Sequence, residues 1–130
     1  MSGFEVGVIA EFHATHALRG DFGPASQPHA HAYRVEATAR GARLRADGTL
    51  FDITRLQSAL AAAIDRLDQR DLNTLEGLAE PNSTAEMVAY WLFGQVAPAL
   101  AGQGVETLQV RVWESPEAFA SYTSATGDVA

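Results

Sequence analysis

The sequence predicts an α+β domain in which two strands, two helices and two further strands follow one another, with two helices on one face of an antiparallel sheet. Three observations predict it. Apolar residues alternate with polar ones over 4–43, recur every three or four positions over 52–100, and alternate again over 105–124. With 130 residues, the chain has the length of one ordinary domain, and we expect a single domain over 1–130.

The first predicted strand, residues 4–16, ends on a histidine. Its even positions are mostly apolar and include Phe12 and His16, whereas His13 occupies an odd position. Successive side chains of a strand point to opposite faces, so His16 lies on the apolar face and His13 on the other face. Glycines and prolines mark residues 19–28 as the loop that follows.

The second predicted strand, residues 29–43, begins with two more histidines. His29 and His31 share their phase with Tyr33 and with the apolar residues that follow it. Both imidazoles therefore lie on the apolar face of this strand. If the two strands pair, three histidines lie on one face of the sheet.

Two helices are predicted between the two pairs of strands. In the first, apolar residues recur at helical spacing until about Asp68, and Asp52 suits the N-cap position. The second follows Ser83-Thr84-Ala85-Glu86, which matches a capping box, and its apolar face continues to about Pro98. The switch from a period of two to a period of 3.6 predicts that the helices form a separate layer.

Two shorter strands are predicted at the end of the chain. One covers residues 105–114, and a weaker one covers 118–124. Glu114 shares the apolar phase of the first of them, which leaves two interpretations. It is either a strand-end carboxylate that reaches water, the commoner case, or a buried acceptor for a ligand with adjacent N–H donors.

The composition excludes several classes of function. A net charge of −7 argues against a nucleic-acid-binding protein, which usually presents a basic face. No apolar run reaches the ~18 residues of a membrane span, and no signal peptide is recognisable, so we expect a cytoplasmic protein with no membrane partner. The chain has no cysteine for a thiolate nucleophile or a disulfide, and no lysine for a Schiff base.

His16, His29 and His31 form a candidate metal site. Neutral imidazole is the preferred nitrogen ligand of zinc, and three protein ligands with an open fourth position are typical of catalytic zinc sites. The alternative is that each histidine is hydrogen-bonded separately or lies in solvent at a strand end. Spacing alone leaves both interpretations open. Asp68 is similarly either a helix-terminal surface residue, which its position favours, or a general base, and His13 is read as a surface or subunit-contact residue.

Six motifs occur in order along nearly the whole chain: Phe12-His13-Ala14-Thr15-His16, His29-Ala30-His31-Ala32-Tyr33, Gly48-Thr49-Leu50-Phe51-Asp52, Leu67-Asp68-Gln69-Arg70-Asp71-Leu72-Asn73, Ser83-Thr84-Ala85-Glu86 and Trp113-Glu114. The ordered set resembles the 6-pyruvoyl-tetrahydropterin synthase and 6-carboxy-tetrahydropterin synthase family. The resemblance implies a tunnelling fold, in which subunits join into a barrel, commonly a hexamer of two trimers with active sites between subunits.

The same resemblance implies roles for individual residues. His16, His29 and His31 correspond to the zinc ligands, so the implied cofactor is Zn²⁺. Glu114 corresponds to the carboxylate that holds the pterin ring of a small-molecule substrate, and backbone contacts to that substrate come from around Thr84. The implied partners are further copies of the chain in a homo-oligomer.

Two departures from the family pattern concern proton transfer. Family members usually carry a cysteine near the position of Ala25, and an Asp-His pair where this chain has Asp68 and Gln69. Alanine cannot accept a proton, and the amide of glutamine does not titrate near pH 7. Each positioned acid or base is typically worth ~10²–10⁴-fold, so their loss should weaken the usual reaction of dihydroneopterin triphosphate.

Lewis-acid chemistry stays available, with Asp68 or a metal-activated water as the base. The lesser candidates are Tyr33, His13, Asp21 and Glu11.

Three functions therefore stay open. The first is a zinc-dependent lyase or cyclase with altered acid–base residues, acting on a pterin or on a repurposed substrate, including one of specialised metabolism. The second is an ordinary tetrahydropterin synthase with a substitute base. The third is a non-catalytic ligand-binding module that keeps the fold. We rank the altered enzyme first because a structural role gives little reason for a three-histidine site beside Glu114.

Overall fold

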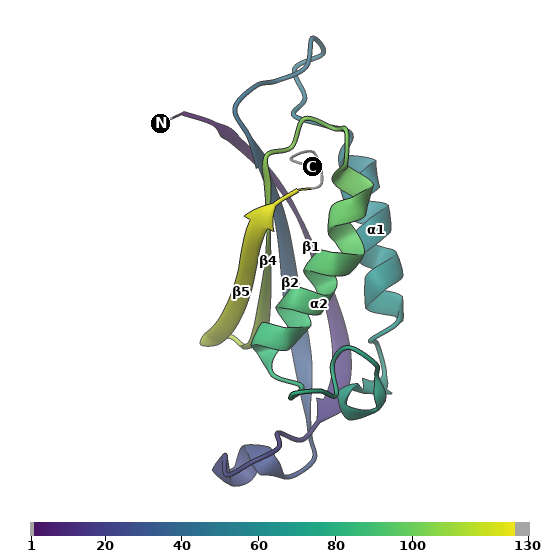
Figure 1. Cartoon of the computed structure of the whole chain (residues 1–130), viewed down its shortest axis with the longest axis vertical. Coiled ribbons are helices and arrows are strands. Elements are labelled where there is room, and N and C mark those ends of the chain that lie inside the picture. The colour runs from purple at the N-terminus through teal and green to yellow at the C-terminus, as the bar shows by residue number, and fades with distance from the viewer. Residues whose placement is uncertain (1, 127–130) are drawn as a thin grey trace.

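The computed structural model describes residues 2–126. A five-stranded sheet is covered on one face by two helices (Figure 1). The elements, in chain order, are β1 (Phe4–His16), β2 (His29–Gly41), α1 (Ile53–Asp65), β3 (Arg70–Asp71), α2 (Ala85–Val96), β4 (Thr107–Ser115) and β5 (Ala118–Ala125). The predicted α+β class and the order of two strands, two helices and two strands are confirmed, and β3 is an addition to them.

The sheet has the strand order β3-β1-β2-β4-β5. The four long strands are antiparallel to their neighbours, whereas β3 runs parallel to β1 and pairs with it through only two residues. A strand of two residues has no alternation to detect, which is why the sequence did not predict it. It nevertheless places the segment after α1 against the outer edge of β1.

The alternation predicted for β1 and β2 matches the burial of their side chains. Phe12, Tyr33 and Val35 are fully buried beneath the helices, and the strands pair in a register that puts His16 directly opposite His29. On the opposite face, Ile9 is 59% exposed. The apolar core therefore lies on the helix side, and it continues up to the end of the sheet that carries the histidines.

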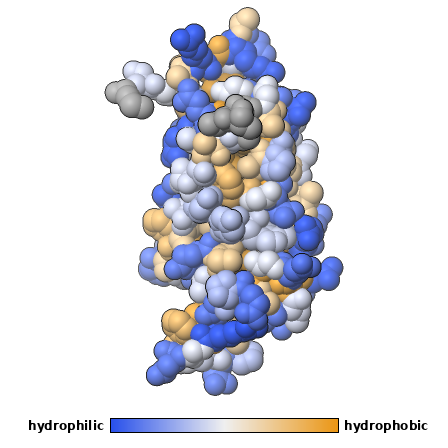
Figure 2. Space-filling view, viewed as in Figure 1, coloured by the Kyte–Doolittle hydropathy of each residue, from blue (hydrophilic) through white to orange (hydrophobic). Residues whose placement is uncertain are grey.

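The helices complete this core through residues at helical spacing. The buried leucines Leu56, Leu60 and Leu92 face the sheet, and full burial of each such side chain contributes about 1.5–3 kcal/mol. On the face seen in Figure 2, hydrophobic residues show through at the centre, while hydrophilic residues dominate the sides. In the described part of the chain, no helix is long and apolar enough to cross a membrane.

Some predicted boundaries are wrong by a few residues. α1 ends at Asp65 instead of near Asp68, because Leu67 and Asp68 both donate to the carbonyl of Ile64 in a terminal turn. Leu67 is buried, so the apolar spacing of the helix continues in the sequence to a residue that lies in a turn. β2 ends at Gly41, two residues early, and β4 begins at Thr107, two residues late.

The start of α2 differs from the capping box that the sequence predicts. Thr84 is the N-cap, and its hydroxyl accepts a hydrogen bond from the backbone N–H of Met87 at 3.2 Å. The helix therefore starts one residue later than a Ser83 cap would require. Ser83 is completely buried, and its carbonyl contacts His16 on β1. At its other end, α2 stops at Val96 and continues as a 3-10 turn, Ala97–Leu100.

Candidate metal centre

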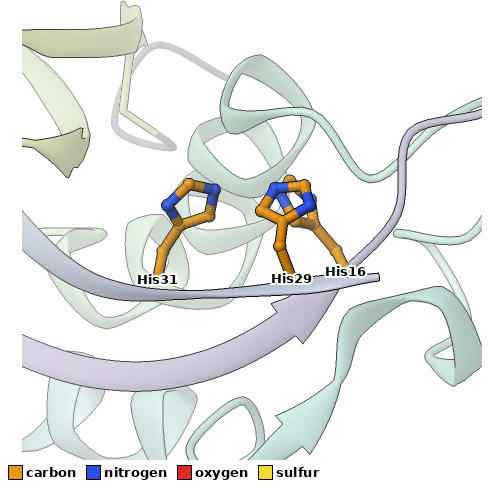
Figure 3. A group of neighbouring side chains, drawn as sticks. All are labelled: His16, His29 and His31. Carbon is orange, nitrogen blue, oxygen red and sulfur yellow. The ribbon is translucent and has the colours of Figure 1, made fainter. Parts of the chain in front are cut away.

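The structure brings His16, His29 and His31 together on the helix side of the sheet. His29 and His31 project from β2 and His16 from the adjacent β1, with all three rings on one side of the strands (Figure 3). One nitrogen from each ring lies within 4.8 Å of the other two, so the group could hold a metal ion. The ring centroids are 4.5–5.1 Å apart, and the rings meet edge to face.

Backbone carbonyls orient two of these rings. Nδ1 of His16 lies 2.7 Å from the carbonyl oxygen of Ser83, and Nδ1 of His29 lies 2.8 Å from that of Gln27. A carbonyl oxygen can only accept, so Nδ1 must carry the proton in each neutral ring. The lone pair is then on Nε2 of both histidines. Such a contact fixes the tautomer and the orientation that a metal ligand needs.

Two of the remaining ring nitrogens have no hydrogen-bonding partner in the described part of the chain. Nε2 of His16 and Nε2 of His31 are buried and accept or donate no hydrogen bond there. An unsatisfied buried polar atom costs free energy, about 1–3 kcal/mol each, unless a ligand, ion or water satisfies it. These two nitrogens are therefore placed where they could bind a metal ion, and no hydrogen bond within the described chain occupies them.

Burial also favours the neutral form of His16 and His31, because it lowers the pKa of both imidazoles. It lowers the pKa of His16 below the ordinary histidine value, although the hydrogen bond to the Ser83 carbonyl opposes the shift. Burial likewise lowers the pKa of His31, against the opposing charge of Glu114. A metal binds only the neutral form of imidazole, so both shifts favour metal binding near pH 7.

Glu114 is part of the same site. Its Oε2 lies 3.3 Å from Nε2 of His31. The two atoms are within ion-pair distance, but Nε2 of His31 makes no hydrogen bond in the described part of the chain. The Glu114 side chain is about one-third exposed. A partly exposed carboxylate beside three imidazoles can accept hydrogen bonds from a ligand that lies on the histidines.

Tyr33 closes the inner wall of the site. Its ring stacks on Phe12 with centroids 4.7 Å apart and lies 5.2 Å from the ring of His31. The residue is 1% exposed, and its hydroxyl is buried with no hydrogen-bonding partner in the described chain. Burial, and then the nearby charge of Glu114, raise the pKa of the phenol above its ordinary value. Tyr33 is therefore a neutral group at neutral pH.

Asp68 and Gln69 lie at the β1 edge, and no described contact joins them to the three histidines. Oδ1 of Asp68 accepts a hydrogen bond of 2.9 Å from the backbone N–H of His13, and the N–H of Gln69 donates to the His13 carbonyl at 2.6 Å. Gln69 has a φ of 61°, a left-handed conformation that few non-glycine residues adopt. Two backbone contacts thus hold this dipeptide against β1.

The other predicted residues occupy separate places. Thr84 caps α2 next to the Ser83 carbonyl, and Ala25 lies in the loop between β1 and β2, where its carbonyl accepts from the N–H of Leu18. Glu11 lines a hollow of about 460 Å³ on the sheet face opposite the helices, together with Arg34 and Trp113. The exposed side chain of His13 lies on that face too, as its phase predicted.

Sequence reasoning missed the groups that orient the histidines. The carbonyls of Ser83 and Gln27 carry no side-chain signal, and Ser83 is 67 residues from His16. From the sequence, Tyr33 is only a lesser candidate for the base. Its place in phase with His29 and His31 was the available signal that it borders the site.

A family model of 6-pyruvoyl tetrahydropterin synthase matches residues 5–125. The chain belongs to this family. It is 29% identical to a protein of Pyrococcus horikoshii provisionally named 6-carboxy-5,6,7,8-tetrahydropterin synthase, over 87% of this chain and 85% of that protein. A function of the tetrahydropterin-synthase type is therefore the coarse assignment that the comparison supports.

Solved structures agree on the fold. The 6-pyruvoyl tetrahydropterin synthase of Caenorhabditis elegans superposes with a TM-score of 0.81 at 21% identity, over 96% of this chain and 98% of that one. The synthase of Plasmodium falciparum gives 0.81 at 18% identity, over 96% and 99%. At these identities the likeness establishes the fold of the single chain, which is the subunit of the tunnelling fold that the family resemblance implies.

Proposed function

We propose that the protein is a zinc-dependent lyase of the tetrahydropterin-synthase type that acts on a pterin, or on a related small molecule, with altered acid–base residues. The observation that carries this proposal is the group of three imidazoles beside Glu114, in which the Nε2 atoms of His16 and His31 are buried and have no hydrogen-bonding partner in the described part of the chain. Family membership supplies the class of reaction. The chain itself supplies the departures, because it contains no cysteine.

His16, His29 and His31 would hold the zinc ion. Two of the three rings are oriented through Nδ1, and the donor set is three imidazole nitrogens, which is a ligand set found in catalytic zinc sites. When bound, zinc polarises an oxygen of the substrate or lowers the pKa of a bound water. The Ser83 carbonyl then acts as the outer hydrogen-bonding partner that fixes His16.

Glu114 would hold the substrate. A carboxylate can accept two adjacent N–H groups of a guanidine-like ring edge, a bidentate arrangement that fixes orientation as well as adding affinity. The distance of 3.3 Å between Glu114 Oε2 and His31 Nε2 puts the carboxylate next to the metal ligands. A substrate held by Glu114 therefore extends naturally toward the histidines, and the backbone near Thr84 lines the same end of the molecule.

Asp68 would act as the base, supplied by another subunit. Within one chain its carboxylate bonds to the backbone of His13 at the edge of β1, and no described contact joins it to the three histidines. The edge strands of the sheet in one chain are β3 and β5, and an edge can pair with another copy. A homo-oligomer, with a hexamer as the expected form, would bring Asp68 of one subunit to the histidines of the next.

The test is incubation of the zinc-loaded protein with dihydroneopterin triphosphate, followed by identification of the products by mass spectrometry. Turnover in wild type, reduced by about 10²–10⁴-fold in Asp68→Asn with zinc retained, supports the proposal. Asp65→Asn is the matched control, because Asp65 is an exposed carboxylate at the end of α1. It should leave turnover unchanged.

Other outcomes point to the alternatives. Turnover that is unaffected by Asp68→Asn would favour an ordinary synthase with a different base. Tight binding of the pterin without chemical change would favour a ligand-binding module. If the protein neither binds nor turns over any pterin, a pterin substrate is refuted.

A further inference from the structure

Among the described residues of the site, the Tyr33 hydroxyl is a buried polar group that neither metal binding by the histidines nor the fold explains. Tyr33 is 1% exposed, yet its hydroxyl has no hydrogen-bonding partner among the described residues. Buried tyrosine hydroxyls normally find a partner, and leaving one unsatisfied is destabilising. A phenylalanine would fill the same apolar space beside Phe12 without that cost. The retained hydroxyl therefore points to a partner outside the chain.

The surroundings of the ring indicate where that partner lies. Tyr33 follows His31 by two positions on β2, so both side chains leave the same face, and the two ring centroids are 5.2 Å apart. The ring of His16 lies 6.2 Å away. Phe12 occupies the remaining side in a parallel stack with an interplanar angle of 11°. The ring is thus held rigidly between the apolar core and the histidines.

Glu114 borders Tyr33 from the neighbouring strand. The pairing of β2 with β4 ends with Arg34 opposite Trp113, and Tyr33 and Glu114 are the next residues on the two strands. Glu114 is close enough for its charge to contribute to the raised pKa of Tyr33. Glu114 also approaches His31 at 3.3 Å. The histidines, Glu114 and Tyr33 therefore lie next to one another, and a ligand that bridges the histidines and Glu114 would pass beside Tyr33.

We infer that the Tyr33 hydroxyl hydrogen-bonds to the small molecule held between the three histidines and Glu114, and that it is a binding residue. This rests on the proposed function, because that function places a ligand in this space. The phenol can donate its proton to an oxygen or ring nitrogen of the ligand, or accept from an N–H. His31 on β2 and Glu114 on β4 would contact the same ligand, so a hydrogen bond from Tyr33 would help to fix the orientation of that ligand at the inner end of the site.

The test compares wild type, Tyr33→Phe and the control Tyr122→Phe. Tyr122 packs against Tyr90 and Phe93 with centroids 4.9 and 5.0 Å away, so the control makes the same chemical change away from the histidines. The probes are zinc alone and biopterin, an unreactive pterin with a two-hydroxyl side chain. Zinc content, the melting temperature of the metal-free protein and the biopterin Kd are measured for each form.

For Tyr33→Phe we expect unchanged zinc content and a metal-free melting temperature equal to or above that of wild type, because the lost hydroxyl had no partner. Biopterin binding should weaken by about threefold to tenfold, the worth of one hydrogen bond. Tyr122→Phe should bind biopterin as wild type does.

Two results would overturn this inference and leave the proposed function intact. Equal biopterin affinity of wild type and Tyr33→Phe would leave Tyr33 as a packing residue. A clearly lower melting temperature of metal-free Tyr33→Phe would show that the hydroxyl has a partner within the chain. If wild type binds no biopterin, the pterin assignment of the proposed function fails, and this inference fails with it.

Discussion

Removal of the Thr84 cap should weaken both the fold and the metal centre, because the start of α2 carries the carbonyl that orients His16. The Thr84 hydroxyl accepts from the N–H of Met87 at 3.2 Å, and the preceding carbonyl, of Ser83, accepts from Nδ1 of His16 at 2.7 Å. Thr84→Ala leaves that N–H without its cap and lets the first turn of α2 fray. The carbonyl then holds His16 less firmly.

The size of the effect follows from the cap and the length of the chain. Loss of an N-cap hydroxyl costs about 1 kcal/mol. At about 2.1 cal/mol/K per residue, the unfolding entropy of 130 residues is about 0.27 kcal/mol/K, so the melting temperature should fall by about 4 °C. Loss of an outer partner of a ligating histidine typically costs 10–100-fold in metal affinity. Because the Ser83 carbonyl is loosened and not removed, we expect about tenfold.

The assay is thermal unfolding together with zinc titration against a competing chelator. Thr84→Ser keeps a capping hydroxyl and should restore both properties. Asp52→Ala is the matched control, because Asp52 caps α1 by accepting from the N–H of Thr54, away from the histidines. It should lower the melting temperature and leave zinc affinity unchanged. If Thr84→Ala melts lower but binds zinc as tightly as wild type, the coupling between α2 and the metal centre is refuted.

Two further predictions concern protonation and strain. Burial lowers the pKa values of His16 and His31 below 6.5, so the unfolded chain binds more protons there, and metal-free protein should lose stability as pH falls from about 6.5 through the lowered values. The melting temperature should depend less on pH between 7.5 and 5 in His31→Gln than in wild type, whereas His13→Gln should keep the dependence of wild type. The same pH dependence in both variants would contradict this. Gln69→Gly should raise the free energy of unfolding by about 1 kcal/mol, because glycine adopts a φ of 61° without strain. Gln69→Ala should not raise it. If Gln69→Gly is no more stable than wild type, the conformation of Gln69 is unstrained.

Much of the fold was predictable because it rests on periodicity. The alternation in β1 and β2 extends over 13 residues in each strand, long enough to assign the faces of all four histidines. The helices were predictable for the same reason, but their ends were not. Leu67 continues the helical spacing in a turn, and Thr84 takes the cap next to a serine that could equally have served.

The site was predictable only in its side chains. The phase of the three histidines predicts that they lie on one face, and in the structure one nitrogen of each ring lies within 4.8 Å of the other two. The carbonyls of Ser83 and Gln27 were not predictable, since every residue has such a group and only the folded chain selects one. The contact of Asp68 with the His13 backbone depends on the two-residue strand β3, which has no sequence signal.

The most direct test of the metal centre is the zinc content of the purified protein by elemental analysis. Wild type should contain one zinc per chain, and His31→Ala should contain none. His13→Ala is the matched control, because His13 lies on β1 like His16 but on the exposed face of the sheet, and it should keep the full zinc content. Absence of stoichiometric metal in wild type, or full zinc in His31→Ala with unchanged stability and activity, would contradict a metal centre built on His16, His29 and His31.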